Sequence, residues 1–325
     1  MRRCVRCDDH PDLMAASTTT SVASTPGAPT ATRWQLMVAF FIIYVVWGST
    51  YLAIRWGVAT IPPFTMGAAR FLVAGSALYA FTRWRGATKP SRLEWRNSAI
   101  VGTMLLFIGN GAVSWASQRV NSGMTSVLIA TVPLWLVLSE LWQGRRPRVV
   151  QVIGVAIGLV GVGLLVLPGR GAEAAVDPLG AAVLALSSLS WTIGSLFSRT
   201  AKLAQPAALA IAMQMLVGGT LLLLLSGVTG EWQRISPDAI TFRSLMALLY
   251  LIVFGSLIAF STYMWLLKVA SPAAVGTYAY VNPVVAVILG VVLGGERLPA
   301  LAITAMAVIV SGVVLVSLVP ARRTG

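Results

Sequence analysis

Ten apolar runs follow one another along the 325 residues, each about 19 to 22 residues long. A helix rises 1.5 Å per residue, so about 20 apolar residues suffice to cross the hydrocarbon core of a bilayer. Only 10% of the residues are charged, whereas a soluble domain has about 25%. The sequence therefore predicts an all-α polytopic membrane protein. We expect ten transmembrane helices, at about 35–55, 63–82, 98–117, 123–141, 149–167, 179–198, 207–227, 245–266, 273–293 and 300–319.

Basic residues in the short connections predict the orientation of these helices. If both termini are cytoplasmic, the cytoplasmic segments hold 17 Lys and Arg residues and the opposite side holds 6. Short cytoplasmic loops carry such an excess in membrane proteins. We therefore expect a multi-pass protein of the cell (inner) membrane with both termini in the cytoplasm. Because topology accounts for the basic residues, the net charge of +14 does not indicate nucleic-acid binding.

The two ends of the chain lack a spanning run. Residues 1–33 are rich in Ser, Thr, Pro and Ala, a composition that predicts a disordered tail. Residues 320–325 form a short cytoplasmic tail. Cys4 and Cys7 are the only cysteines, and with His10 they lack the second ligand pair of a zinc finger. We expect no metal site and no disulfide framework.

A proline interrupts one apolar run in each half of the chain. Residues 276–283 read G-T-Y-A-Y-V-N-P and residues 126–133 read S-V-L-I-A-T-V-P. Pro283 and Pro133 lack an N–H group and crowd the carbonyl four residues earlier, so each is expected to break its helix. A freed carbonyl in hydrocarbon needs a polar partner. Paired broken helices indicate a binding site near the membrane midplane, whereas either proline alone would more simply be a packing kink.

The two halves also match at other positions. Trp47 and Arg55 correspond to Trp191 and Arg199 at a spacing of 144 residues. At 150 or 151 residues the matched pairs are Trp115 with Trp265, Pro133 with Pro283, and Gly161 with Gly312. Five spans per half is an odd number, so the second copy enters the membrane in the opposite sense. This predicts inverted repeats at 34–168 and 179–319, an arrangement typical of transporters.

Several of these stretches resemble one known family. They are W-G-S-T-Y-L-A-I-R at 47–55, the Pro62-Pro63 pair followed by Arg70-Phe71, the run ending in N-P-V at 276–284, and G-G-E-R at 294–297. Together they resemble the EamA-type exporters of the drug/metabolite transporter superfamily, over about residues 35–320. The resemblance implies ten helices in two EamA repeats, an inner-membrane location and export of small metabolites or drugs. Residues 144–147 read G-R-R-P, where the family often has G-E-R-P.

Polar and aromatic residues recur on single faces of the predicted helices. Tyr44, Trp47 and Tyr51 lie at i, i+3 and i+7, and other spans carry comparable stripes. Hydrogen bonding between helices is the alternative explanation for each residue taken alone. As substrate-binding candidates in a central cavity we select Trp47, Tyr51, Asn110, Trp191, Gln214, Tyr263, Tyr280 and Asn282.

Two ionisable residues besides tyrosine, Arg70 and Glu140, lie within predicted spans, and Glu140 is near the cytoplasmic end of its span. Such residues usually face protein or water and mark functional sites. Arg70 is predicted either to hold an anionic group or a helix terminus, or to brace the fold. Glu140 is predicted either to form a salt bridge near the loop or to couple transport to protons. It is the only one of ten acidic residues within a predicted span.

These patterns favour a secondary transporter over an enzyme. The one histidine, His10, lies in the tail, so the bundle has no histidine base or histidine metal ligand. We expect export of small metabolites or drugs by alternating access, without a cofactor. A facilitator or importer of the same solutes and a non-transporting membrane scaffold are the alternatives. The expected partners are a small-molecule substrate and the lipid bilayer, with a homodimer left open.

Overall fold

A computed structural model describes residues 31–142, 144, 148–166, 177–270, 272–296, 298 and 300–317. Nearly all of these residues lie in helices, and the described part contains no strand. The predicted tails lie outside the described residues, apart from 31–33. The predicted all-α fold is confirmed.

Helical segments correspond to all ten predicted spans in the described part of the chain. In the first half they are α1 (Arg33–Gly57), α2 (Pro63–Trp84), α3 (Arg92–Gly102) continued by η1 (Thr103–Asn110) and α4 (Gly111–Ala116), α5 (Ser122–Ile129) with α6 (Val132–Trp142), and α7 (Val149–Val166). In the second half they are α8 (Pro178–Thr200), α9 (Ala207–Val228), α10 (Phe242–Tyr250) continued by η4 (Leu251–Phe260) and α11 (Ser261–Val269), α12 (Pro272–Val275) with α13 (Tyr278–Val292), and α14 (Ala300–Ser317). Two short 3₁₀ turns, η2 (Glu231–Arg234) and η3 (Pro237–Ala239), lie between α9 and α10. Seven of the segments are long and apolar enough to cross a membrane, and α7, α13 and α14 contain shorter apolar helices.

Local sequence signals explain where several helices begin. Thr32 and Ser91 form capping boxes with Gln35 and Glu94 at the starts of α1 and α3. In this motif each side chain bonds the other residue's free backbone N–H. Asp177 accepts a hydrogen bond from the Gly180 N–H at the start of α8. Proline is the first residue of α2 and of α8, a position that needs no N–H donor.

Contacts between helices follow the internal repeat. α2 packs on α9, α5 on α13 and α7 on α14, so each pair joins equivalent helices of the two halves. The equivalent helices α1 and α8 also make equivalent contacts. α1 packs on α13, and α8 packs on α5 and α6. Likewise, α8 packs on η1 and α4, and α1 packs on η4 and α10. Exchanging the two halves thus reproduces these contacts. This reciprocity, with five spans per half, defines two inverted five-helix repeats.

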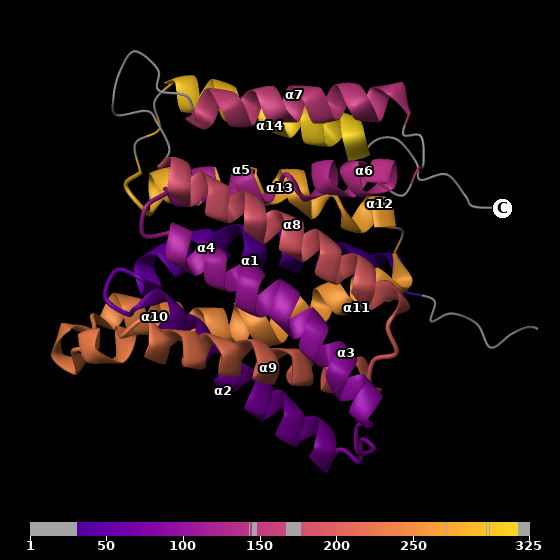
Figure 1. Cartoon of the computed structure of the whole chain (residues 1–325), viewed down its shortest axis with the longest axis vertical. Helices are drawn as coiled ribbons and strands as arrows, with labels where there is room; N and C mark the ends of the chain where they lie inside the picture. The colour runs from indigo at the N-terminus through magenta and orange to yellow at the C-terminus, as the bar shows by residue number, and fades with distance from the viewer. Residues whose placement is uncertain are drawn as a thin grey trace, which may run out of the picture. The chain divides into compact units, whose positions relative to one another are not determined.

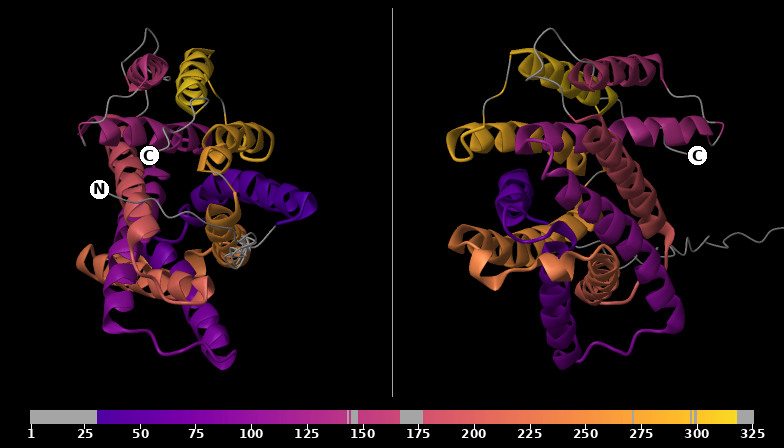
Figure 2. Two further views of the ribbon diagram at one scale, coloured as in Figure 1. Left: turned by 90° about the vertical axis from the view of Figure 1, so that its right-hand side faces the viewer. Right: turned by 60° about the vertical axis from the view of Figure 1, so that its left-hand side comes forward.

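The described helices form successive layers (Figure 1). α7 and α14 lie side by side at the top of the view, and α2 and α9 lie at the bottom. Beneath α7 and α14, α5, α6, α12 and α13 form one layer, α1, α4, α8 and α11 lie below it, and α3 extends down to the level of α2. Figure 2 shows the same order from two other directions. Two pairs of equivalent helices, α7 with α14 and α2 with α9, therefore lie toward opposite ends of this view, and the third pair, α5 with α13, lies between them.

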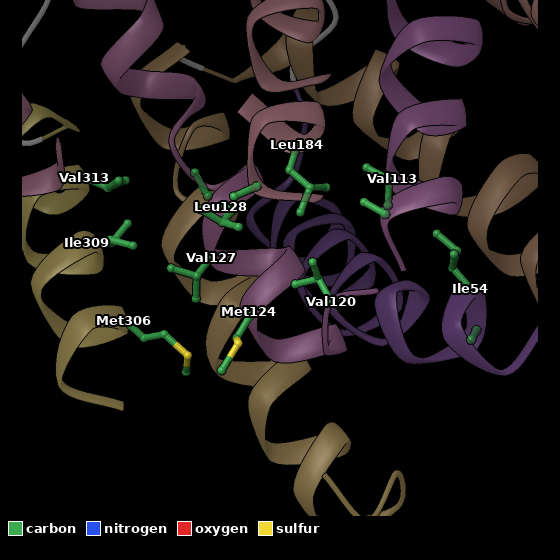
Figure 3. Close-up of a cluster of buried hydrophobic side chains, with 14 of the residues drawn as sticks. Ile54, Val113, Val120, Met124, Val127, Leu128, Leu184, Met306, Ile309 and Val313 are labelled. Carbon is green, nitrogen blue, oxygen red and sulfur yellow. The ribbon is translucent and has the colours of Figure 1, made fainter. Parts of the chain in front are cut away.

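A continuous apolar core joins the layers. Buried side chains from α14, α5, α8, α4 and α1 belong to one cluster. Figure 3 shows Ile309 of α14, Leu128 of α5 and Leu184 of α8 along this cluster, with Ile54 of α1 at its far edge. All four are at most 2% exposed. Burial of this kind holds α14 to the helices around the central site.

Glycine permits the closest approach between α7 and α14. A Cβ atom added to Gly312 would lie 2.6 Å from both the carbonyl oxygen of Gly154 and the nitrogen of Gly158. A Cβ atom on the matched Gly161 would lie 2.9 Å from the nitrogen of Ile309. Each matched glycine therefore packs on the helix of the other repeat. Small residues at helix contacts allow such backbone approach in membrane proteins.

Polar contacts identify the two ends of the bundle. At one end Phe64 and Thr65 bond Glu231, Arg55 bonds Asn121, and Ser244 bonds the carbonyl of Trp56. We call this the Gly57 end, after the last residue of α1. At the opposite end Asn97 bonds the carbonyl of Lys202, and we call it the Arg33 end. Trp115 lies at the Gly57 end beside Gln118, while the matched Trp265 lies beside Trp34 at the Arg33 end.

Candidate functional site

A cavity with a volume of about 80 Å³ lies among helices of both repeats. α1, α2, α4, α5, α6 and η1 contribute side chains from the first half, and α8, α9, η4 and α13 contribute them from the second. Its polar lining residues are Trp47, Thr50, Tyr51, Arg70, Asn110, Ser187, Trp191, Ser256, Tyr278 and Asn282. The other half of the lining residues are apolar, so the cavity suits an amphipathic solute.

Five of the predicted substrate-binding residues line this cavity. Trp47 and Tyr51 reach it from α1, Asn110 from the end of η1, Trp191 from α8 and Asn282 from α13. Helical periodicity had placed Trp47 and Tyr51 on one face, and the fold turns that face inward. Arg70, predicted either to bind an anion or to brace the fold, also lines the cavity.

A cluster of four aromatic rings lies at one side of the cavity. The Trp47 ring lies 6.1 Å from Trp191 in an edge-to-face arrangement, 4.8 Å from Tyr263 and 5.4 Å from Tyr278, measured between ring centroids. Tyr263 and Tyr278 are 5.8 Å apart, also edge to face. Aromatic pairs at these distances attract one another beyond simple burial. We call these four residues the aromatic cluster. It joins α1, α8, α11 and α13 at the centre of the protein.

A second cavity, of about 110 Å³, adjoins the first across this cluster. Trp191, Tyr278 and Val132 line both cavities. Tyr263 lines only the second cavity, so this predicted substrate-binding residue belongs to the aromatic cluster but not to the lining of the central cavity. Arg199, the sequence match of Arg55, lies at the rim of the second cavity near the end of α8. The aromatic cluster therefore separates the central cavity from a cavity that extends toward the Arg33 end.

The two interrupted spans meet helices of the opposite repeat through equivalent hydroxyl contacts. The first interruption lies at Ala130 and Thr131, between α5 and α6, and the Thr131 hydroxyl lies 3.3 Å from that of Ser188. The second lies at Gly276 and Thr277, between α12 and α13. There the Thr277 hydroxyl lies 2.5 Å from that of Tyr44.

These two contacts obey the internal repeat. Tyr44 and Ser188 are 144 residues apart, the same spacing as Trp47 and Trp191. Each threonine hydroxyl also donates to a carbonyl three residues earlier, so it satisfies part of the interrupted helix end. The interruptions are thus tied to α8 and α1, which carry the two cavity tryptophans.

The position of Pro283 corrects the expectation of matched proline breaks. Pro133 is the second residue of α6, directly after the first interruption. Pro283 instead lies inside α13, and the chain is interrupted earlier, at Gly276 and Thr277. Thr131 and Thr277 are 146 residues apart whereas the prolines are 150 apart. The four-residue difference is about one helical turn. α13 therefore begins about one turn earlier relative to its proline than α6 does.

π-helical segments occupy equivalent positions in the two repeats. η1 and η4 lie in the matched third and eighth spans, and both contribute to the cavity wall. π-helical turns are rare and often occur at functional sites. At the end of η1 the Asn110 side chain donates to the carbonyl of Leu105, five residues earlier, at 3.2 Å. The widened turns therefore place Asn110, Ser256 and Phe260 at the cavity.

Arg70 is buried, and its Nε donates a 2.8 Å hydrogen bond to the hydroxyl of Ser256 on η4. Its guanidinium carbon also lies 4.9 Å from the centre of the Phe71 ring. Gly255 gives the group room, since a Cβ atom there would lie 3.0 Å from Nη2. No described cavity-lining residue is acidic. The ion pairs found among the described residues, Arg55–Glu296 and Arg119–Asp177, involve other arginines.

Asn282 connects α13 to α1. With its amide nitrogen facing α1, it donates to the carbonyls of Ile43 and Tyr44 at 3.3 and 3.2 Å. A Cβ atom on Gly48, one turn further along α1, would lie 3.2 Å from the carbonyl oxygen of Asn282. This close packing fixes the part of α1 that carries Trp47, so Asn282 both lines the cavity and positions its wall.

The remaining predicted residues do not join the site. Gln214 is fully buried on α9, lies outside the lining of the central cavity, and its amide has no hydrogen-bond partner among the described residues. A Cβ atom on Gly102 would lie 2.5 Å from the backbone oxygen of Gln214, so this stretch of α9 packs tightly on α3. The side chains of Tyr280 and Glu140 lie outside the described residues.

Sequence reasoning did not select Tyr278 as a site residue. Tyr278 lies four residues before Asn282 and therefore on the same face of α13. Tyr280 lies two residues from each of them in the sequence, so the helical period does not group it with that face. Applying the helical period to the interrupted span would have favoured Tyr278. Ser187 and Phe71, both on the cavity wall, were not selected either, although Ser187 lies four residues before Trp191 and Phe71 directly follows Arg70.

A polar network joins three segments at the Gly57 end. Arg55 of α1 donates to the Asn121 side chain at 2.7 Å and lies 3.6 Å from a carboxylate oxygen of Glu296. Glu296 is buried and accepts from the backbone N–H groups of Ser122 and Gly123, at 2.9 and 3.4 Å. The carboxylate thereby caps α5, where negative charge is stabilising. Glu296, the acidic residue of the G-G-E-R stretch, therefore connects the end of α1 to the start of α5.

Inverted repeats around a central amphipathic cavity define a membrane transporter fold. The EamA-like transporter family matches residues 34–167 and 178–318, one match in each half of the chain. The chain belongs to this family, as its sequence motifs predicted. It is thus a transporter by family, and its apolar helices make it a multi-pass membrane protein.

Curated relatives agree with this assignment. The uncharacterized inner membrane transporter YedA of Escherichia coli K12 is 41% identical over 87% of this chain and 90% of its own length. Protein PecM of Dickeya dadantii is 25% identical over 83% of this chain and 88% of its own. The chloroplastic WAT1-related protein At3g02690 of Arabidopsis thaliana is 25% identical over 90% and 70%. A solved structure described only as a protein crystal structure has a TM-score of 0.59 at 22% identity, covering 87% of this chain and 97% of its own, and supports the fold alone.

Proposed function

We propose that this protein exports small amphipathic solutes by alternating access through the central cavity. The observation that carries the proposal is the cavity itself, which both inverted repeats build around the matched pair Trp47 and Trp191. A site on the axis that relates two inverted repeats lets one repeat move against the other and expose the site to either side. A scaffold protein would need no polar cavity at this position.

Contacts at the two sides of the cavity support a gated path. Toward the Arg33 end the aromatic cluster separates the central cavity from the second cavity. Toward the Gly57 end the network of Arg55, Asn121 and Glu296 holds α1 to α5. The two sets of contacts are separate, so one side can open while the contacts at the other side hold, as alternating access requires.

The orientation follows from the basic residues. Positive charge is concentrated in the connections at the Arg33 end, so we place that end in the cytoplasm. The cavity beyond the aromatic cluster then faces the cytoplasm, and the Gly57 end faces outward. A solute moving outward enters past Arg199, crosses the aromatic cluster and leaves when the Arg55 network opens.

The test is solute flux in liposomes reconstituted with the purified protein. A panel of labelled amphipathic solutes is measured by counterflow, in wild type and in Trp47→Ala and Trp191→Ala variants. Both variants remove apolar and aromatic contacts from the site, so we expect at least one solute to show flux that each variant reduces. Trp34→Ala is the matched control, because Trp34 lies on the same helix as Trp47 and is 70% exposed.

Three results decide between the alternatives. Absence of flux for every solute, with correctly folded protein, favours the scaffold. Flux that Trp34→Ala lowers as much as Trp47→Ala places the path elsewhere. Accumulation of solute in everted vesicles but not in right-side-out vesicles supports export, whereas the reverse supports import and equal rates support a facilitator.

A further inference from the structure

The guanidinium of Arg70 is a buried positive charge on the cavity wall without an acidic partner among the described lining residues. Burying an unpaired charge is costly, because low-dielectric surroundings replace its hydration shell. Charged residues inside membrane spans are therefore usually paired or functional. A group that brings negative charge into the cavity would remove this cost. The cavity thus carries an electrostatic preference even though almost all of its lining is neutral.

We infer that the transported solute carries an anionic group, of which carboxylate is the best fit, and that Arg70 binds it. This inference rests on the proposed transport function and names the solute class. The sequence left Arg70 either to hold an anionic group or a helix terminus, or to brace the fold, and the structure places it on the cavity wall.

Hydrogen-bond geometry supports a carboxylate in particular. Ser256 accepts the hydrogen bond from Nε, which fixes the guanidinium plane. No described residue accepts a hydrogen bond from Nη1 or Nη2. These two nitrogens form the end of the guanidinium fork and can bind both oxygens of one carboxylate. Ser256 is 1% exposed, so it holds the fork without competition from bulk water.

The surroundings of Arg70 favour an apolar body on the anion. Phe71 and Phe260 line the same cavity, and the Trp47 and Trp191 rings form its side toward the aromatic cluster. A solute with a carboxylate at Arg70 and an aromatic or aliphatic portion against these rings would satisfy both kinds of surface. Gly255 leaves space for the guanidinium, since any Cβ atom there would lie 3.0 Å from Nη2 and 3.2 Å from the Cγ2 atom of Thr50.

The experiment compares three probes that share one body: 3-phenylpropionate, its carboxamide, and 3-phenylpropylamine. Binding to the purified full-length protein is measured by ligand-induced thermal stabilisation, and flux is measured in liposomes. We expect the carboxylate to bind about 10- to 100-fold more tightly than the carboxamide, that is by about 1.4 to 2.8 kcal/mol. The protonated amine should bind most weakly of the three.

Variants assign this preference to Arg70. Arg70→Gln should abolish the preference for carboxylate over carboxamide, and Arg70→Lys should retain part of it. Arg243→Gln is the matched control, because Arg243 is an exposed arginine that stacks on Trp56 at the Gly57 end, outside the cavity. A bracing role for Arg70 would lower binding of all three probes equally and leave their ratio unchanged.

Each outcome has a defined consequence. Equal thermal stabilisation of the wild-type protein by the carboxylate and the carboxamide overturns the inference. This comparison uses the wild-type protein alone, so it can be made even if the Arg70→Gln protein folds poorly. Flux of the carboxamide or amine without flux of the carboxylate also overturns it but leaves the transport function intact. Tight carboxylate binding with no flux of any probe supports the anion site and counts against transport.

Discussion

Glu296 offers the sharpest test of the network at the Gly57 end. Replacing it with glutamine keeps the shape of the side chain and one acceptor oxygen but removes the charge. The wild-type carboxylate caps α5 through two backbone N–H groups and lies 3.6 Å from Arg55. Glu296→Gln should therefore weaken both the cap and the connection between α1 and α5.

The two contributions differ in magnitude. A negative charge at a partly buried helix N-terminus stabilises by about 0.3 to 2 kcal/mol. The Arg55 side chain is 37% exposed, so solvent screens the ion pair, and its contribution is only about 0.5 to 1 kcal/mol. Only the second contribution links α1 to α5. We therefore expect the open fraction at the Gly57 end to rise about two- to fivefold.

Cysteine accessibility measures this fraction. Val113 lies on α4, is 7% exposed and lines the central cavity. In a protein whose two native cysteines are replaced by serine, Val113→Cys should react with a membrane-impermeant thiol reagent only when the Gly57 end opens. Its labelling rate should rise about two- to fivefold in Glu296→Gln, in line with the change in open fraction.

Glu231 provides the matched control. It is 4% exposed and caps α2 through the N–H groups of Phe64 and Thr65, but no arginine among the described residues forms an ion pair with it. Glu231→Gln should lower thermal stability to a similar extent and leave the labelling rate unchanged. Equal acceleration by both variants, or none in Glu296→Gln, would refute the assigned role. Arg55→Gln should reproduce the acceleration, and the double variant should add little.

Three further predictions address orientation and packing. In the same cysteine-free background, Ser236→Cys should label from outside the cell and Thr88→Cys only after permeabilisation; the opposite pattern would reverse the topology. Gly312→Ala should lower stability by about 1 to 3 kcal/mol through overpacking of α7 against α14. Thermal unfolding checks this, and an unchanged midpoint would contradict the contact; Ser311→Ala, on an exposed position of α14, is the control. Asn282→Ala should lose two hydrogen bonds to α1, each contributing about 0.6 to 1.5 kcal/mol. Both the unfolding midpoint and the solute affinity should therefore fall. A loss of affinity with an unchanged unfolding midpoint would indicate that Asn282 only contacts the solute.

The sequence by itself determined the class of protein and its repeat. Apolar length is a local property, so ten spans could be counted without knowledge of their packing. Tryptophan and proline are uncommon enough that their matched spacings revealed the two halves, and the motifs around Trp47 and Asn282 indicated the family. Within α1, the period of the helix correctly grouped Trp47 with Tyr51, because neighbouring turns share a face whatever lies opposite them.

Only the tertiary structure decided which faces point inward. A helix that is apolar all round carries no signal that separates lipid from protein contact. Gln214 was therefore expected at the cavity but packs against α3, and Tyr278 was not selected although it lines the site. At the interruption at Gly276 and Thr277, the Thr277 hydroxyl contacts the hydroxyl of Tyr44, which is 233 residues away in the chain. The role of Arg70 also depends on packing. Only the tertiary structure shows that Ser256 lies beside its guanidinium and that no described cavity-lining residue is acidic.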